Sequence, residues 1–178
     1  MSQLNEPPYV KLFMGLIYNQ AESENTALKK LSAELGEIDY QSPETHFDHS
    51  TYYKDEMGEG LLRKLITFKK LIPREQIVGV KAFTNKLEEV FSYEDRRSIN
   101  IDPGYIAYEH VILSTGKGYS HRPYLGSGVY ADLTLIYMND EYKTLNWTYP
   151  DYGTKEMRAL FKHLRQQYAG QLAEESNI

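Results

Sequence analysis

Residues 10–18 read Val-Lys-Leu-Phe-Met-Gly-Leu-Ile-Tyr, and this nearly unbroken apolar run follows Pro7 and Pro8. A strand that is covered on both faces of a sheet has such a run, whereas a strand with one face in water alternates apolar and polar residues. The run therefore predicts a central, doubly covered strand near the start of the sequence.

The segment after this run has helical spacing. Leu28, Leu31 and Leu35 recur at intervals of three and four residues, and Gly36 follows as a C-terminal stop. We therefore expect a helix over residues 25–35, so that a strand is followed directly by a helix.

A second strand and two further helices are indicated later in the chain. Residues 61–72 predict a strand that ends before Pro73. Proline suits the first residue of a helix, where no backbone donor is needed, so Pro73 predicts a helix with buried Ile77, Val80 and Leu87. A last amphipathic helix is expected over residues 153–173. Its apolar stripe consists of Met157, Leu160, Phe161, Leu164 and Tyr168.

Residues 38–60 predict an irregular, polar connection that is long for a compact domain, and such loops are usually functional or mobile. His46, Asp48 and His49 lie there with a spacing that metal ligands can have. In an extended segment, however, His46 and Asp48 would share one face and His49 would lie on the other. We therefore favour a polar loop over a zinc, manganese or iron site.

Residues 98–102 predict a short strand that places Asn100 and Asp102 on one face, before Pro103 and Gly104 turn the chain. Asp102 could contact a ligand, or it could cap this turn through its own backbone. Residues 106–113 fit either a strand or a short helix, and we favour the helix.

Residues 119–149 predict three antiparallel strands, because Gly126-Ser127-Gly128 and Asn139-Asp140 are typical hairpin turns. A three-residue first loop would place Arg122 opposite Asp132, Tyr124 opposite Tyr130 and Ser120 opposite Thr134. A two-residue second loop would add Trp147 opposite Asp132 and Tyr149 opposite Tyr130. The other face, with Leu125, Val129, Ala131, Leu133 and Leu135, would be the core face.

By the same alternation His121 points to the core face and away from Arg122, unless a bulge reverses the pattern. His121 is then either a hydrogen-bonded core histidine or a site residue. Arg122 and Asp132 are either a structural cross-strand pair or part of a site.

Composition narrows the functional classes. The chain has 178 residues and a formal net charge of −5, which argues against a surface built to neutralise nucleic-acid phosphates along its length. It has no cysteine, so a disulfide, a thiolate metal site and a cysteine nucleophile are excluded. No signal-peptide pattern and no run near the roughly 18 apolar residues of a membrane span occur, so we expect a cytoplasmic protein without a membrane partner.

Nucleotide-binding motifs are not matched. A phosphate-binding P-loop needs Ser or Thr directly after its Lys, but Gly118 follows Lys117. Paired carboxylates for glycoside chemistry could come from Asp102, Asp132 and Asp151, although nothing in the sequence fixes their separation.

Five segments together resemble a prokaryotic family of single-domain proteins of unknown function that are about this long. They are residues 11–17, residues 52–58, Asn100-Ile101-Asp102-Pro103-Gly104-Tyr105, Tyr119-Ser120-His121-Arg122 and Trp147-Thr148-Tyr149-Pro150-Asp151-Tyr152. The resemblance covers nearly the whole chain. Some members of that family carry an automatic label of GTP-binding protein, which the residues examined above do not explain.

These observations predict one α+β domain over residues 1–178, with a mainly antiparallel mixed sheet of about six strands and three or four helices. The leading functional hypothesis is that a polar, tyrosine-rich pocket binds a small anionic or phosphate-bearing, nucleotide-like ligand. The residues expected to form this site are Asn100, Asp102, Tyr105, Ser120, His121, Arg122, Tyr124, Asp132, Trp147, Tyr149 and Asp151.

Two other hypotheses are open. The protein could be an enzyme that acts on a nucleotide or phosphoester, with His121 as general acid or base. Asp102 would then orient His121 or hold a divalent cation, and Arg122 would stabilise developing charge. Alternatively, it could be a protein-interaction module with an exposed Tyr and Trp face.

Overall fold

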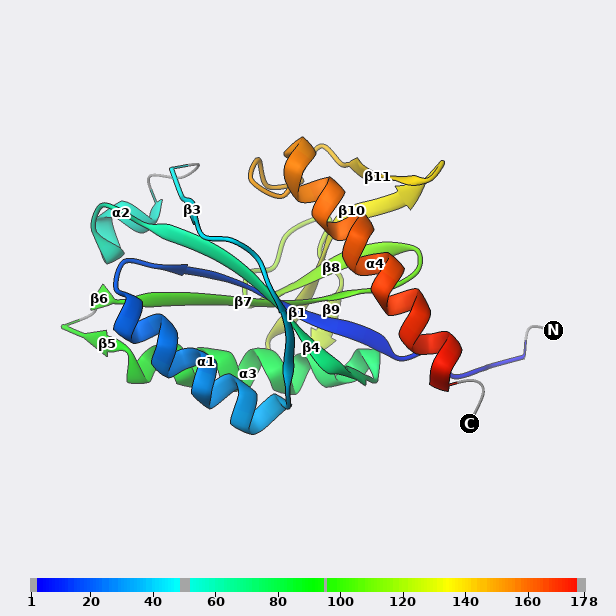
Figure 1. Ribbon diagram of the computed structural model, residues 1–178, viewed down its shortest axis with the longest axis horizontal. Helices are drawn as coiled ribbons and strands as arrows, with labels where there is room; N and C mark the ends of the chain where they lie inside the picture. Colours follow the sequence, from blue (N-terminus) through cyan, green and yellow to red (C-terminus); the bar gives the residue numbers. More distant parts are fainter. Residues whose placement is uncertain (1–2, 49–51, 95, 176–178) are drawn as a thin grey trace.

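The strand β1 (Val10–Tyr18) lies inside a nine-stranded sheet, between β4 (Leu62–Ile72) and β7 (Ile99–Ile106), and all of its residues are buried. The predicted central strand is therefore confirmed. The structure, a computed structural model, describes residues 3–48, 52–94 and 96–175 (Figure 1).

The main sheet runs in the order β11-β10-β8-β7-β1-β4-β2, and β3 and β9 pair with β4 and β10. Its other strands are β2 (Ile38–Gln41), β3 (Thr45–His46), β8 (His110–Thr115), β9 (Tyr124–Gly126), β10 (Val129–Met138) and β11 (Glu141–Thr144). The short strands β5 (Ser92–Tyr93) and β6 (Arg96–Arg97) form a separate hairpin. The helices are α1 (Ala21–Leu35), α2 (Tyr52–Met57), α3 (Ile77–Val90) and α4 (Lys155–Glu175), and a 3₁₀ turn (Arg74–Gln76) precedes α3.

Residues 10–106 contain two split β-α-β units. Helix α1 connects β1 to β2, and α3 connects β4 to β7 through the β5–β6 hairpin, with one antiparallel strand inserted in each unit. The resulting order β7-β1-β4-β2 is the ferredoxin-like arrangement. Strands β8, β10 and β11 extend this sheet at the β7 edge, so the α+β prediction is confirmed with more strands than expected.

The two faces of the sheet have separate cores. Leu12, Met14 and Leu16 of β1 pack with residues of α1 and α3, such as Leu31 and Ile77. The opposite face packs on α4, where the rings of Phe13 and Phe161 meet edge to face at 5.1 Å. Figure 1 shows α1 and α3 together under the sheet and α4 across its other side.

The helices predicted over residues 25–35, after Pro73 and over residues 153–173 are confirmed. Helix α1 begins earlier than residue 25 and ends before Gly36, whose φ of +100° suits glycine. Pro73 precedes the 3₁₀ turn that leads into α3, and Ile77, Val80 and Leu87 are buried there.

The predicted turn at Pro103 and Gly104 is wrong, because both residues lie within β7. The backbone N–H of Ile101 points away from β1 and donates to Glu88. Pro103 lies two residues further along the strand, so the N–H that proline lacks would also point away from β1. The pairing of β7 with β8 starts only at Gly104, and therefore no ladder bond is lost. The alternative that Asp102 caps a turn is overturned with it.

Two other expectations are corrected. Residues 106–113 are not helical: the N–H of Ala107 donates a hydrogen bond to His110 O at 2.9 Å, as in a tight hairpin, and β8 begins at His110. Residues 38–60 contain β2, β3 and α2 where an irregular connection was expected. Both errors arise because pairing with distant strands overrides local spacing.

The second hairpin agrees with the prediction near its turn, whereas the three-residue first loop is wrong: Gly126 pairs with Val129, and a register shift then brings Tyr124 opposite Tyr130. Asn139 and Asp140 both have positive φ, and the β10–β11 register follows from that two-residue turn as far as Thr144. Trp147 and Tyr149 lie beyond β11 and are not in the ladder. Strand β9 begins at Tyr124, which pairs with Tyr130, so Ser120 is not opposite Thr134.

The single core face expected for β10 is wrong. The register with β8 shifts between Leu133 and Leu135, so the faces exchange at this bulge. Ala131 belongs to the core under α1 and α3, whereas Leu135 belongs to the core under α4.

Candidate functional site

A cavity of about 760 Å³ lies where β7 and β8 separate. The two strands pair only from Gly104 to Ile106, so the first half of β7 has no strand on that side. Glu88 of α3 accepts a hydrogen bond from the N–H of Ile101 at 2.6 Å and so satisfies part of this open edge. The cavity is further lined by β8, β10, the α2 region and residues 149–152.

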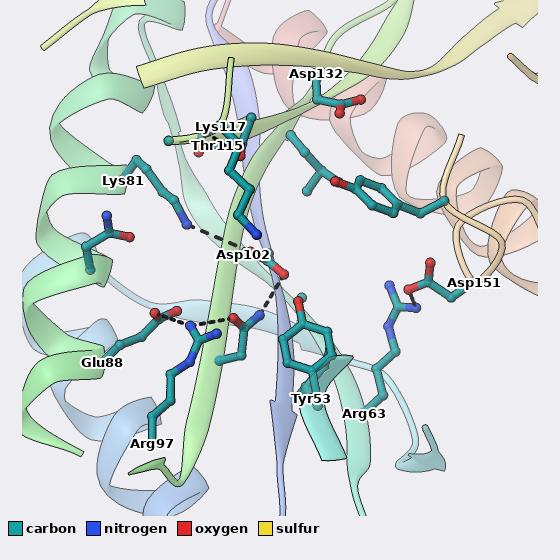
Figure 2. Close-up of a pocket in the computed structure, with 18 of the residues that line it drawn as sticks. Tyr53, Arg63, Lys81, Glu88, Arg97, Asp102, Thr115, Lys117, Asp132 and Asp151 are labelled. Atoms are coloured by element: carbon teal, nitrogen blue, oxygen red, sulfur yellow. Dashed lines mark hydrogen bonds and ion pairs between the residues drawn. The ribbon is translucent and has the colours of Figure 1, made fainter. Parts of the chain in front are cut away.

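Asp102 lies at the centre of the lining (Figure 2). Its Oδ2 atom accepts a hydrogen bond from Asn100 Nδ2 at 2.7 Å, and its Oδ1 atom lies 3.8 Å from Lys81 Nζ. Figure 2 shows that Lys81, from α3, and Lys117, from the loop after β8, both point toward Asp102. Two cations thus share the neighbourhood of one carboxylate.

Arg97 organises one end of the cavity. It makes a two-pronged ion pair with Glu56, at 2.6 and 2.9 Å, and donates to Glu88 at 2.7 Å and to Asn100 Oδ1 at 2.8 Å. Burial raises the pKa of Glu88, although the N–H of Ile101 and the charges of Lys81 and Arg97 oppose this. This network fixes Asn100, which in turn holds Asp102.

The opposite end is closed by a second ion pair. Arg63 bonds to Asp151, and its guanidinium stacks over the ring of Tyr152 at 4.5 Å. The hydroxyl of Tyr152 lies against Gly15 of β1, where a Cβ atom would be only 2.7 Å away. Glycine at this position therefore lets the ring reach the sheet, and burial raises the pKa of the Tyr152 phenol.

Aromatic side chains also border the cavity. Tyr53 and Tyr149 belong to its lining, and burial raises the pKa of both phenols. Protonated phenols can both donate and accept hydrogen bonds. These walls suit a polar ligand with ring or hydroxyl groups.

Arg122 lies outside the cavity lining and donates hydrogen bonds to three residues of that lining. Its Nε donates to Asp132 at 2.8 Å, its second nitrogen donates to Lys117 O at 3.1 Å, and its third donates to Tyr149 Oη at 2.7 Å. Lys117, Asp132 and Tyr149 all line the cavity, whereas Arg122 does not. Arg122 is therefore a positioning residue for three separate segments.

A family model described as a domain of unknown function, DUF4416, matches residues 8–168. The chain belongs to the DUF4416 family. Comparison with curated proteins and with solved structures gives no match.

Five of the residues predicted for the site line the cavity of this DUF4416 domain: Asn100, Asp102, Asp132, Tyr149 and Asp151. Arg122 and His121 adjoin it through Asp132, whose Oδ2 lies 2.8 Å from Arg122 Nε and 3.6 Å from His121 Nε2. His121 and Arg122 thus converge on one carboxylate, against the predicted alternation, because residues 119–123 form a turn and not a strand.

Four predicted residues lie elsewhere. Tyr105 is on the core face toward α1 and α3, since it alternates with Asp102 and Gly104 along β7. Ser120 is exposed, and the exposed Tyr124 packs against Tyr130 at 5.1 Å. Trp147 stacks on His121 at 4.7 Å, outside the cavity lining.

Sequence reasoning missed several residues of the cavity, and they are Tyr53, Glu56, Arg63, Lys81, Glu88, Arg97 and Tyr152. A signal existed for two of them. Lys81 and Glu88 fall on the buried stripe of α3, beside Ile77 and Leu87, and charged residues at core positions of a helix require a partner. The others come together only through long-range packing.

Neither a metal-binding cluster nor a membrane-spanning helix is found among the residues that the structure describes. Within residues 3–48, 52–94 and 96–175, no group of three or more His, Asp or Glu side chains is placed to hold a metal ion. His46 and Asp48 are exposed, and His49 lies outside the described residues. Among the helices of the described chain, none has the length and apolar character needed to span a membrane.

Proposed function

We propose that the cavity binds a small polar molecule with an anionic group, the class that includes sugar phosphates and nucleotides. The observation that carries the proposal is that Lys81 is nearly buried while its ammonium group has no hydrogen-bond partner among the described residues. Its side chain is only 10% exposed, yet its ammonium makes no hydrogen bond to any residue that the structure describes, and its nearest anion is Asp102 Oδ1 at 3.8 Å. An ammonium group has three donors to satisfy, and a phosphate or carboxylate oxygen would satisfy them.

The charge balance of the cavity supports this assignment. Its acidic lining residues are mostly engaged: Glu56 and Glu88 pair with Arg97, Asp151 pairs with Arg63, and Asp132 pairs with Arg122. The two members of each pair neutralise each other, so the side of Asp102 that faces Lys81 is the place where a ligand charge is best accommodated.

Other groups of the lining suit the rest of such a ligand. Asp102 offers carboxylate oxygens to hydroxyl groups, and Tyr53 and Tyr149 offer rings and phenols. A volume of about 760 Å³ lies within the range of sites for small molecules, about 300–1,000 Å³.

The enzyme hypothesis has less support. His121, its acid or base, lies outside the cavity lining and is stacked on Trp147. Its Nε2 atom is directed to Asp132, 3.6 Å away, and not to Asp102. Binding is therefore the function that the geometry favours.

Isothermal titration calorimetry with ribose 5-phosphate tests the proposal. Lys81→Met should weaken binding at least about tenfold, because a charge-assisted hydrogen bond contributes about 1.5–3 kcal/mol. Lys86→Met is the matched control, since Lys86 lies on the exposed side of the same helix and outside the cavity. Equal affinity in the two variants, or no binding by the wild-type protein, would reject the assignment.

A further inference from the structure

Three aromatic side chains form a row beside the cavity. His121 stacks on Trp147 with ring centroids 4.7 Å apart and planes 16° apart, and Tyr119 meets His121 edge-on at 5.3 Å. Tyr119 is 70% exposed and Trp147 is 39% exposed. We call Tyr119, His121 and Trp147 the aromatic ledge.

The ledge is held firmly by the sheet. Trp147 Nε1 donates to Leu133 O at 2.8 Å, and Thr148 Oγ1 donates to Thr134 O at 2.7 Å. Both acceptors belong to β10, next to its bulge. The ring of Trp147 is thus oriented before any ligand arrives, which reduces the entropy lost on binding.

The ledge is continuous with the cavity. One atom, Asp132 Oδ2, lies 3.6 Å from His121 Nε2 of the ledge and 2.8 Å from Arg122 Nε, and Asp132 itself lines the cavity. Arg122 also reaches Tyr149 Oη at 2.7 Å, and Tyr149 is both part of the lining and 42% exposed. Asp132 and Arg122 therefore connect the ledge residue His121 to the cavity-lining residue Tyr149.

We infer that the aromatic ledge stacks a planar heterocyclic ring of the same ligand whose anionic group enters the cavity. This inference rests on the proposed function and narrows it from sugar phosphates in general to nucleotides. Exposed aromatic rings on a fixed scaffold stack bases without hydrogen-bond readout, because each base has a π-face. The phosphate would lie near Lys81, the sugar hydroxyls near Asp102, and the base on Tyr119 and Trp147.

The chain contains a single tryptophan among 16 tyrosines, so fluorescence excited at the red edge of the absorption band, where tyrosine does not absorb, reports on Trp147 of the ledge. Adenosine 5′-monophosphate is expected to change the emission of Trp147 on titration, whereas ribose 5-phosphate should bind by calorimetry and leave the emission unchanged. Tyr119→Ala should weaken adenosine 5′-monophosphate roughly five- to hundredfold and leave ribose 5-phosphate unaffected. Tyr93→Ala is the control, because Tyr93 is 79% exposed on β5 and belongs neither to the ledge nor to the cavity lining.

The outcomes separate this inference from the proposed function. Equal affinities for the two probes, with no effect of Tyr119→Ala, would overturn the ledge assignment while the effect of Lys81→Met still supported the cavity. An emission change that follows protein concentration without any probe would also overturn it, since the ledge would then be covered by a second copy of the chain. Loss of the Lys81→Met effect would reject the proposed function instead.

Discussion

The ring of Phe13 covers Gly104 across the β1–β7 ladder, in which the two residues are directly paired. A Cβ atom at position 104 would lie 2.6 Å from the Phe13 ring and 2.4 Å from the backbone oxygen of Ile112. The glycine therefore serves close packing between strands and not a turn. Gly104 is also the first residue of β7 that pairs with β8. The cavity opens before this residue, where β7 and β8 are not paired.

Gly104→Ala should lower the free energy of unfolding by about 2–3 kcal/mol, because the added methyl group meets a backbone atom that cannot move aside cheaply. Urea denaturation measures this change. Gly79→Ala on α3 is the control: nothing lies within 4 Å of its Cβ position, so a gain of about 0.5–1 kcal/mol is expected there. A Gly104→Ala protein as stable as wild type would contradict the packing argument.

Arg122 and Asp132 should be energetically coupled. Their side chains are 11% and 1% exposed and joined at 2.8 Å, so removal of either leaves a buried charge without its partner. A double-mutant cycle with Arg122→Ala and Asp132→Ala is expected to give a coupling energy of about 0.5–3 kcal/mol by chemical denaturation. The same cycle on Lys69 and Glu37, a pair that is 63% and 66% exposed, should give a much smaller value. Strictly additive effects at Arg122 and Asp132 would show that their contact is incidental.

The buried carboxyl of Glu88 predicts a pH dependence. Burial raises its folded-state pKa above 4.5, so the folded protein holds this proton more tightly than the unfolded chain. The stability that follows is complete below the unfolded pKa and is lost as the pH rises through the folded pKa. As the pH increases from about 4 toward neutrality, the unfolding free energy of the wild type should therefore fall relative to that of Glu88→Gln. A difference that is constant over this range would argue against a buried, perturbed carboxyl.

Elements with a strong local pattern could be predicted from sequence. The unbroken run of β1 identifies a central strand, and Pro73 with the stripe of Ile77, Val80 and Leu87 identifies α3. Both depend on periodicity and on end signals within one segment. The predicted contact of Arg122 with Asp132 is present, but the three-residue loop from which it was predicted is not, and Arg122 lies before β9 and not on it.

Features that depend on distant pairing could not be predicted in this way. Pro103 is tolerated in β7 because β8 does not pair with β7 before Gly104. The bulge before Leu135 exchanges the two faces of β10. Neither is encoded in the residues concerned. The same limit applies to the cavity: Asn100 and Asp102 were placed on one face by alternation, whereas Arg63 and Arg97 reach it from segments that meet only in the fold.

Asp102→Asn tests whether Asp102 contacts the sugar hydroxyl groups of a ligand or acts on its phosphate group through charge alone. The carboxylate is the nearest anion to Lys81, at 3.8 Å, and it accepts from Asn100 at 2.7 Å. Removing its charge leaves Lys81 more available, so the affinity for inorganic phosphate should rise. Ribose 5-phosphate should gain less, because an amide oxygen accepts hydrogen bonds from sugar hydroxyls more weakly than a carboxylate does.

The ratio of the two dissociation constants, measured by calorimetry, is therefore the informative quantity, since it cancels the general change in charge. Glu89→Gln is the matched control, because it removes the same charge from an exposed residue of the cavity lining. We expect the preference for ribose 5-phosphate over phosphate to fall several-fold in Asp102→Asn and to stay unchanged in Glu89→Gln. An equal shift in both variants would mean that Asp102 acts only through its charge and does not contact the sugar.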